Sequence, residues 1–494
     1  MSDEREVKLA VPAGFRMPEL TGTTALVAED VEPLRYRSIY VDTDDLRLAR
    51  WGCSLRHREG EGWTLKLPPT LSGPLLVRDE HRFEGDARHV PPAAADLVAA
   101  YVRGSLLHPV VRLRTVRHRT ELRDVEGGPA GEVVDDEVSV MDGARVAVRF
   151  RELEIEVPES VPTSAVDALV GVLVEAGATP TDGVPKYLQA LGARASAPPE
   201  VVAPDLGPEA SVAEVVRGAI ASGVVRLLRH DAGVRLGEDI EDVHQARVAT
   251  RRLRSDLRTF RQVLDPEWDA SVRDELGWLG AELGTVRDLD VQLARLRGRV
   301  SELPEDDRPI GQRFVDELAE RRELAREHLL GAMRSDRYLA LLDRLVAAAR
   351  DPAVLPEAGA APARMALGSV MDRPWKHLKG ALEGLGEDAS DAELHLARIR
   401  TKRARYAAEA VEPVFGKGAR AFARAAADLQ DVLGEHQDAV VARTWLRTEV
   451  AGGGRRAFVA GELAMIELRA AERARSEWEA VWKRLSRKRL RFWR

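Results

Sequence analysis

The sequence of 494 residues has little cysteine and no long apolar run. Its single cysteine, Cys53, excludes an intramolecular disulfide, which fits a reducing compartment. No stretch approaches the ~20 consecutive apolar residues of a membrane-spanning helix, and the polar, acidic start "MSDERE" does not fit a secretory signal. We therefore expect a cytoplasmic protein without a membrane partner.

A strong excess of one charge is also missing. The formal net charge is −7 although 31% of the residues are charged. Bulk charge therefore does not indicate a nucleic-acid partner, and any polyanion must be bound by local basic patches. A chain of this length is expected to form at least two domains, because single cores rarely exceed ~250–300 residues.

The two halves of the chain have different patterns. Up to about residue 190, short runs such as "RYRSIYVDT", "WTLKLP" and "FRELEIEV" alternate at period two, which predicts about eight strands. Residues 193–210 are rich in Pro and Ala and are expected to be a linker. The long segments beyond them, rich in Ala, Leu and Arg, predict helices. We expect one domain at 1–192 and another at 211–494.

The helical half contains an internal repeat, with copies at about 211–350 and 364–494. "VHQARVATRRLR", which contains His244, matches "LHLARIRTKRAR", which contains His395, at an offset of 151 (395 − 244). "LGTVRDLDV", with Gly284, matches "LGEHQDAVV", with Gly434, at an offset of 150 (434 − 284). Such nearly equal offsets predict two copies of one helical bundle that face each other.

Charged residues occupy alternate positions of the predicted strands, and neighbours two apart share a face. Acids lie on the first and last strands, whereas bases lie mostly between them: Glu4, Glu6, Glu152, Glu154 and Glu156 against Lys8, Arg56, Arg58, Lys66, Arg117 and Arg119. For any one strand, a solvated sheet face is the simpler interpretation. As a set, they predict strands that close into a barrel around a charged channel, with apolar faces packed outward on helices. Carboxylates would hold a hard divalent cation, and Arg and Lys would hold phosphate oxygens.

These motifs resemble a known family. "EREVKL" has the Glu-x-Glu-x-Lys signature of CYTH domains, the triphosphate tunnel metalloenzymes, and "YVDTDDLRLARWGCSLRHRE", "WTLKLP", "RDEHRFEG" and "RELEIEV" follow in that family's order. The resemblance covers about residues 1–192. It implies an eight-stranded antiparallel β tunnel with flanking helices, which hydrolyses the terminal phosphoanhydride of a triphosphate with Mg²⁺ or Mn²⁺.

The resemblance also implies roles for single residues. The residues implied as catalytic are Glu4, Glu6, Lys8, Lys66 and Lys186. The implied metal ligands are Glu4, Glu6, Asp136, Glu152 and Glu154, with Glu156 as an alternative to a neighbour and Asp135 as an alternative to Asp136. The implied triphosphate ligands are Lys8, Arg56, Arg58, Lys66, Arg82, Arg114, Arg117, Arg119 and Lys186. The cation would neutralise phosphate charge and orient an attacking water.

The helical half carries a basic stripe twice. One copy steps by 3, 4, 3 and 4 along one helix face, and the second repeats its first three steps: His244, Arg247, Arg251, Arg254 and Arg258, then His395, Arg398, Lys402 and Arg405. A solvated face balanced by acids is the simpler alternative, but acids are scarce in each stripe and like charges at this spacing repel. We favour an external polyanion. Further residues are expected to join its site: Arg226, Arg229, Lys376, Lys379 and His436. Metal ligation is the alternative for the histidines.

Residues 211–494 resemble the CHAD domain, a histidine-containing helical unit associated with inorganic polyphosphate, which is known to follow CYTH domains. The pairing implies a metal-dependent triphosphatase that acts on inorganic tripolyphosphate or another triphosphate and also binds polyphosphate. The alternatives are a non-catalytic polyphosphate scaffold and, ranked below it, an adenylate cyclase of class IV type. The basic, aromatic end "WKRLSRKRLRFWR" fits either a terminal helix packed on the bundle or an extra polyanion contact.

Overall fold

The computed structural model describes residues 4–493 apart from positions 13, 21–25, 73, 74, 78, 125, 159, 182, 387 and 450–452; the side chains of residues 4, 70–72, 75–77 and 449 also lie outside the described part. The chain divides into two compact units, Met1–Pro199 and Glu200–Arg494. The first contains an antiparallel sheet and the second is helical, which confirms the predicted fold class. Among the described residues, no helix is long and apolar enough to cross a lipid bilayer.

The first unit is built on one sheet with the strand order β11-β1-β10-β9-β8-β2-β3-β4-β7. Its strands, in chain order, are β1 (Glu4–Ala10), β2 (Val27–Asp42), β3 (Ser54–Arg58), β4 (Gly62–Lys66), β7 (Glu80–Phe83), β8 (His108–Arg123), β9 (Pro129–Asp142), β10 (Arg145–Pro158) and β11 (Thr179–Pro180). A separate hairpin pairs β5 (Thr70–Ser72) with β6 (Leu75–Val77). Among its described residues are the α-helices α1 (Arg47–Arg50), α2 (Pro92–Leu97), α3 (Ala99–Val102), α4 (Thr163–Glu175) and α5 (Lys186–Leu191).

The sheet differs from the expected eight-stranded barrel in two respects. It has nine strands in the described part of the chain, and it is open, because β11 and β7 form its two edges and do not pair with each other there. The additional strand, β11, has two residues and pairs only with the end of β1. A two-residue strand has no alternation that a sequence pattern could reveal.

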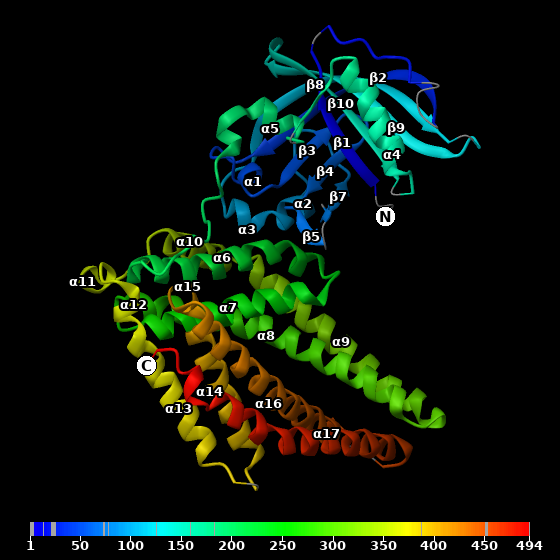
Figure 1. Ribbon diagram of the computed structural model, residues 1–494. Helices are drawn as coiled ribbons and strands as arrows, with labels where there is room; N and C mark the ends of the chain where they lie inside the picture. Colours follow the sequence, from blue (N-terminus) through cyan, green and yellow to red (C-terminus); the bar gives the residue numbers. More distant parts are fainter. Residues whose placement is uncertain are drawn as a thin grey trace. The chain divides into compact units, whose positions relative to one another are not determined.

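The two faces of the sheet are sorted as the alternation predicts. Leu9 on β1 and Leu153 and Ile155 on β10 are buried in one core with Leu169 and Leu173 of α4. In Figure 1, α4 lies across this part of the sheet. Because successive side chains of a strand point to opposite faces, the charged neighbours of these residues face away from that core.

The second unit consists mainly of long helices: α6 (Val212–Leu236), α7 (Ile240–Phe260), α8 (Pro266–Glu302), α9 (Arg308–Met333), α10 (Asp336–Arg350), α13 (Asp372–Glu383), α14 (Asp391–Ala410), α16 (Lys417–Glu449) and α17 (Arg455–Leu485), with the short helices α11 (Pro356–Gly359), α12 (Ala363–Ala366) and α15 (Glu412–Phe415). Their first turns carry clear start signals. Ser211 with Glu214 forms a capping box on α6, and Ser390 with Glu393 does so on α14. These reciprocal bonds satisfy backbone N–H groups that a helix leaves unpaired at its start.

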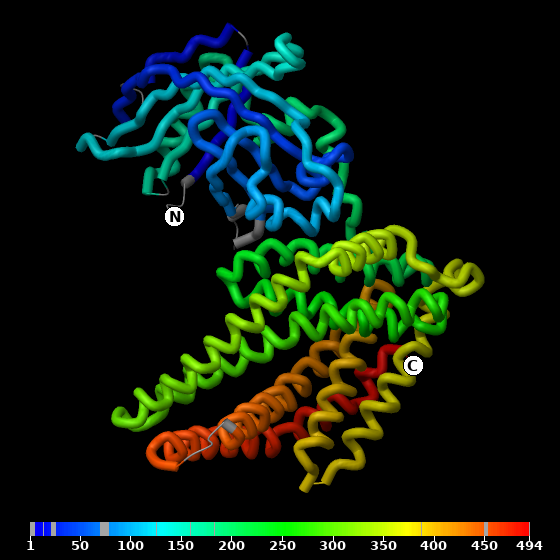
Figure 2. The backbone as a smooth tube through the Cα atoms, turned by 180° about the vertical axis from the view of Figure 1, so that it is seen from behind, coloured from blue at the N-terminus to red at the C-terminus, as the bar shows by residue number. Residues whose placement is uncertain are grey.

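The helical unit shows the predicted repeat. Helices α6 to α9 form one bundle, and α13, α14, α16 and α17 form the other; α7 and α14 start 151 residues apart, as do α8 and α16. Figure 2 shows the hairpins α8–α9 and α16–α17 as two long helix pairs. Their apolar faces share a core that contains Leu296, Phe314, Leu446 and Leu463.

The aromatic residues of the C-terminal segment pack inward. The ring of Trp493 lies 5.4 Å from that of Phe422 and 6.0 Å from that of Trp375, and Arg491 lies over Trp375 at 5.1 Å. Phe492 packs against the same cluster. The apolar part of "WKRLSRKRLRFWR" therefore contributes to the core of the second bundle, as the packing alternative predicts.

Candidate functional site

A cavity of about 790 Å³ opens on the charged face of the sheet. Side chains from distant strands of the sheet line it together: β1 and β10 contribute mainly acids, and β8, β3, β4 and β7 contribute mainly bases. Of the residues predicted from the sequence, it brings together Glu6, Lys8, Arg56, Arg58, Lys66, Arg82, Arg117, Glu154 and Lys186. Acidic and basic walls therefore border the same space, as the channel hypothesis requires.

Three carboxylates form the acidic wall. Glu6 and Glu156 are direct cross-strand partners on β1 and β10, and Glu154 lies two positions before Glu156 on the same face. Carboxylate oxygens of Glu6, Glu154 and Glu156 lie within 4.8 Å of one another. Burial raises the pKa of Glu156, and the charges of Glu154 and Glu6 raise it further. Crowded carboxylate oxygens of this kind fit a hard divalent cation, which would relieve their repulsion.

Two lysines hold the centre of this wall. Lys8 Nζ contacts Glu154 and lies 2.8 Å from Glu6. Lys186, the first residue of α5, places its Nζ 2.8 Å from Glu154 and 3.0 Å from Glu152. Although burial favours a neutral Glu154, Lys186 and Lys8 together lower the pKa of Glu154 well below its usual range. The carboxylate therefore stays ionised at neutral pH.

The other predicted metal ligands lie elsewhere. Asp136 is fully buried and accepts hydrogen bonds of 2.9 and 2.7 Å from Arg117, and Lys186 lies 2.7 Å away. Glu152 is also buried and accepts a bond of 2.8 Å from Gln189. Neither residue lines the cavity. The side chain of Glu4 lies outside the described residues. Among the described carboxylates, Glu6, Glu154 and Glu156 cluster at the cavity, so Glu156, the alternative offered by the sequence, is better placed than Asp136 or Glu152; the metal ligands themselves stay a prediction.

The basic wall is held by residues that the sequence reasoning did not single out. Arg58 lies over the ring of Tyr36 at 4.2 Å and donates to Glu61 at 2.9 Å. Lys66 Nζ lies 3.0 Å from Glu80. Tyr36, Glu61 and Glu80 all line the cavity. The alternation in "RYRSIYVDT" could have found Tyr36, because it puts Tyr36, Ser38 and Tyr40 on one face.

Two predicted phosphate ligands are not in the cavity. Arg114 is exposed on the opposite face of β8, where it pairs in register with Arg37 and Ser139. Arg119 shares the face of Arg117 but donates a bond of 2.7 Å to Glu132 and lies outside the cavity lining.

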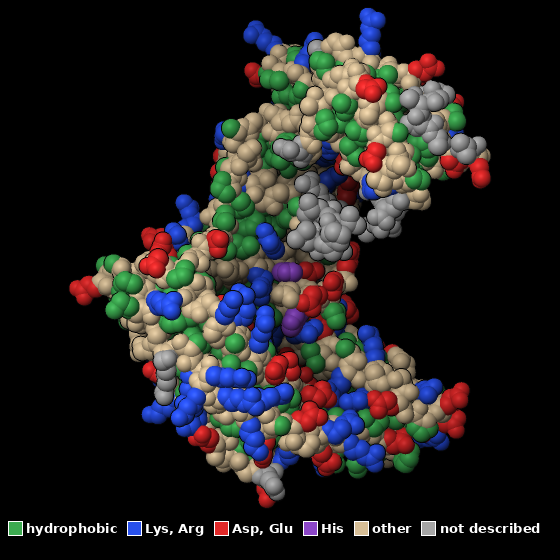
Figure 3. Space-filling view, in the orientation of Figure 1, with side chains coloured by type: hydrophobic (Ala, Val, Ile, Leu, Met, Phe, Trp, Pro, Cys, Tyr) green, Lys and Arg blue, Asp and Glu red, His purple; other side chains and the backbone are tan. Residues whose placement is uncertain are grey.

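The helical unit contains a basic groove of about 380 Å³ between α7 and α8. Arg247, Arg251 and Arg254 from the first stripe line it, together with Gly284 and Asp288. A Cβ atom at Gly284 would meet the guanidinium of Arg247 in its present position, so any larger residue there would require that side chain to move. Figure 3 shows Lys and Arg side chains gathered on the visible face of this unit.

The second stripe repeats the arrangement. Arg247 lies 3.7 Å from Asp288, and Arg398 lies 3.8 Å from Asp438 at the corresponding place of the second bundle. Burial, together with the nearby charges of Arg398 and Arg251, lowers the pKa of Lys402 to about 7. Arg251 of α7 also lies over the ring of Tyr406 on α14 at 5.5 Å, so the helices that carry the two stripes lie against each other.

The remaining predicted polyphosphate ligands differ in exposure and pairing. His436 is buried with its Nε2 3.2 Å from Asp391, so it does not present a surface ligand. Arg405 lies 3.1 Å from Glu409, and Lys379 lies 3.4 Å from Glu383. Arg229 and Lys376 are exposed, whereas Arg226, His244 and His395 are half-buried. Arg258 lines a different pocket from the groove.

Comparison with known proteins covers both units. The family model described as CYTH domain matches residues 2–175, and the model described as CHAD domain matches residues 218–447. An uncharacterized protein of Mycobacterium tuberculosis is 32% identical over 512 aligned positions, which cover 98% of this chain and 96% of that protein.

Two of the solved structures that are similar to this chain each align with more than half of it. PptA from Streptomyces chartreusis is 23% identical and aligns with 56% of this chain and 100% of its own, at a TM-score of 0.45. The CHAD domain from the plant Ricinus communis is 28% identical and aligns with 58% of this chain and 95% of its own, at a TM-score of 0.49.

Proposed function

The chain belongs to the proteins in which a CYTH domain is followed by a CHAD domain, and we propose that it is a divalent-metal-dependent triphosphatase with a helical unit that binds inorganic polyphosphate. The observation that carries the first part is the 790 Å³ cavity with a carboxylate wall and a basic wall. CYTH domains are generally dependent on divalent metals, and the three clustered carboxylates supply suitable oxygens.

Each wall has a separate task in this proposal. Arg56, Arg58, Lys66 and Arg117 bind the phosphate oxygens of the substrate, and guanidinium groups suit this because they donate two parallel hydrogen bonds. Tyr36 supports the orientation of Arg58. Glu6, Glu154 and Glu156 would hold Mg²⁺ or Mn²⁺, which would neutralise phosphate charge and lower the pKa of bound water.

The two lysines maintain the acidic wall. Lys8 and Lys186 keep Glu154 ionised, so the carboxylate can accept a cation at neutral pH. Both also line the cavity, where their ammonium groups can contact phosphate. In this proposal Lys8 and Lys186 therefore serve the metal centre and the substrate together.

The test of the enzyme proposal is phosphate release. The purified full chain is given Mg²⁺ or Mn²⁺ with tripolyphosphate, thiamine triphosphate or nucleoside triphosphates in turn. We expect metal-dependent release from at least one of them, and Glu6→Gln should reduce kcat/KM by about 100-fold. Glu137→Gln, on the opposite face of β9, is the matched control. If no triphosphate releases phosphate, the enzyme proposal fails and the scaffold alternative stands; a cyclic nucleotide product would identify a cyclase.

The observation that supports polyphosphate binding is the pair of basic stripes with matching Arg–Asp contacts at Arg247 and Arg398. A linear polyanion offers one phosphate after another to such a row of cations. Arg247→Ala combined with Arg398→Ala should weaken binding of long-chain polyphosphate by about tenfold or more. The assay is done in EDTA so that no chain is hydrolysed, and Arg297→Ala combined with Arg469→Ala, both exposed, is the control. Unchanged affinity of the stripe variant would refute this role.

A further inference from the structure

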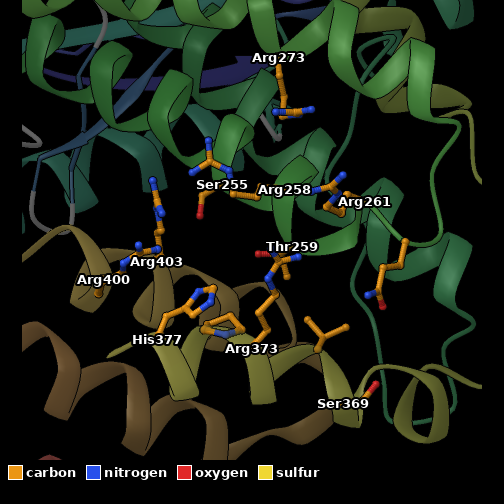
Figure 4. Close-up of a pocket in the computed structure, with 13 residues that line it drawn as sticks. Ser255, Arg258, Thr259, Arg261, Arg273, Ser369, Arg373, His377, Arg400 and Arg403 are labelled. Carbon is orange, nitrogen blue, oxygen red and sulfur yellow. The ribbon is translucent and has the colours of Figure 1, made fainter. Parts of the chain in front are cut away.

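A second pocket of the helical unit lies where α7, α8, α13 and α14 meet, and its volume is about 290 Å³. Its charged lining consists of Arg258, Arg261, Arg273, Arg373, Arg400 and Arg403, with His377 beside them. Figure 4 shows these side chains around the pocket. Of this set, which we call the arginine pocket, only Arg258 belongs to the predicted stripes.

The arginine pocket has little acidic charge of its own. Arg273 is paired with Asp269 at 2.9 Å. Within the part of the chain that the structure describes, no carboxylate pairs with Arg258, Arg400 or Arg403. Burial lowers the pKa of Arg403, and the charges of Arg258 and Arg400 lower it further. Like charges held together in this way destabilise the fold unless an anion joins them.

The internal repeat shows that a cluster of arginines without acidic partners is not a general property of this helix crossing. At the offset of 151, Arg403 corresponds to Arg252, and Arg258 corresponds to Glu409. In the equivalent crevice, Arg252 lies 3.0 Å from Glu409, so the two charges neutralise each other. The arginine pocket has an arginine where its counterpart has that glutamate. One copy of the crossing is therefore neutralised by an ion pair, whereas the described carboxylates provide no such partner for Arg258 and Arg403 in the other.

We propose that the arginine pocket binds a compact anion with two or more phosphate groups, and that Arg258, Arg400 and Arg403 are its principal ligands. Guanidinium groups from different helices can grip several phosphate oxygens at once. The hydroxyl groups of Ser255 and Thr259 line the same space and offer further hydrogen bonds. The ligand has two candidate sources, free pyrophosphate or tripolyphosphate and the end of a long polyphosphate chain.

The decisive variant is Arg258→Glu, which copies the neutralised crevice of the other repeat. Calorimetric titration of the full chain in EDTA with pyrophosphate should detect a site that this variant weakens by about tenfold or more, because a charge-assisted contact is replaced by repulsion. Orthophosphate should bind this site more weakly than pyrophosphate. Arg258→Lys keeps the charge and should retain most of the affinity. Arg297→Glu, an exposed change of equal charge, is the control.

Two results would overturn the proposal: equal pyrophosphate affinity in Arg258→Glu and Arg297→Glu, or equal affinity of the site for orthophosphate and pyrophosphate. Circular dichroism and thermal unfolding establish that the compared variants are folded. Competition with long-chain polyphosphate then separates the two sources, since displacement at one chain per protein indicates a chain end. The site is independent of turnover in the sheet unit, because loss of phosphate release without loss of this binding would refute only the enzyme proposal.

Discussion

At the scale of the residue, Lys402 makes polyphosphate binding sensitive to pH. Burial and the charges of Arg398, Arg251 and Arg247 lower its pKa to about 7, against the opposing charge of Asp438. The amine is therefore protonated below pH 7 and increasingly neutral above it. A bound polyanion favours the charged form, so binding should take up protons and strengthen as the pH falls from 8 to 6.

The measurement is the Kd for long-chain polyphosphate at pH 6, 7 and 8 for the wild type and Lys402→Arg. The arginine stays charged throughout this range, so its binding should vary less with pH. Calorimetry in buffers of different ionisation enthalpy gives the proton uptake directly. Equal pH slopes for the two proteins would show that Lys402 does not titrate with binding.

Asp256 offers a second residue-scale prediction, this time for stability. It is buried on α7, 4.0 Å from Arg252, and burial raises its pKa to about 8. The folded state therefore holds a proton that the unfolded state releases above its own pKa of 3.8. The protonated carboxyl of Asp256 therefore contributes its full stabilisation to the folded state at low pH. This contribution is lost as the pH rises towards 8, and the free energy of unfolding falls by at most ~1.4 kcal/mol per pH unit.

Asp256→Asn should remove this slope, because the amide does not titrate. Denaturant unfolding between pH 5 and 8, followed by helical circular dichroism, measures it. The variant should be the more stable protein at pH 8 and show a flatter dependence. The second repeat has Ala407 at the corresponding position, so the bundle does not depend on a carboxylate there. Parallel pH curves for the two proteins would contradict the assignment.

At the scale of the element, strand alternation predicted the correct face for Glu6, Lys8, Glu154 and Glu156, because side chains alternate strictly along a strand. The pattern does not give the register between two strands. In the structure, Glu156 lies opposite Glu6, whereas Glu152 lies opposite Ala10. This is why the sequence supported Glu152 as a ligand and left Glu156 as an alternative. The sequence pattern also does not show which strands pair, so it could not reveal that the sheet is open.

This register gives a prediction about the metal. Glu156→Gln should raise the Mg²⁺ concentration needed for half-maximal turnover by about tenfold to 100-fold, since it removes a carboxylate from the cluster of three. Glu152→Gln should change that concentration less, because Glu152 does not line the cavity and is not part of the cluster of three carboxylates. Metal titration of phosphate release measures both variants. A larger metal effect for Glu152→Gln would restore the assignment made from the sequence.

In the helices, too, the sequence pattern predicted which residues share one face of an element. The stripe spacing placed Arg247, Arg251 and Arg254 on one face, and the structure brings them to one groove. The arginine pocket was missed because Arg400 and Arg403 lie off the stripe of α14. They meet Arg258 only through the crossing of two helices that are about 150 positions apart in the sequence. A helical wheel describes only one helix, so it does not show which residues of two crossing helices come together.

At the scale of the whole molecule, the two units have separate cores and separate charged sites. Substitutions that share no partners usually have additive free energies, within about 0.5 kcal/mol. We therefore expect Arg56→Ala to impair turnover of tripolyphosphate and leave polyphosphate binding unchanged. Arg247→Ala with Arg398→Ala should have the opposite pattern, and a chain with all three changes should show both losses at their separate magnitudes.

Four proteins are compared: the wild type, Arg56→Ala, Arg247→Ala with Arg398→Ala, and the chain with all three changes. For each, kcat/KM for tripolyphosphate is measured without polyphosphate and again with long-chain polyphosphate at saturation. Without the polymer, the logarithms of kcat/KM should add. With it, inhibition that is equal in the wild type and the stripe variant would come from competition at the sheet cavity alone. Inhibition that depends on Arg247 and Arg398 would mean that occupancy of the helical unit changes the sheet site. That outcome would contradict independent units, because linkage requires a ligand to act differently on two states of the other site.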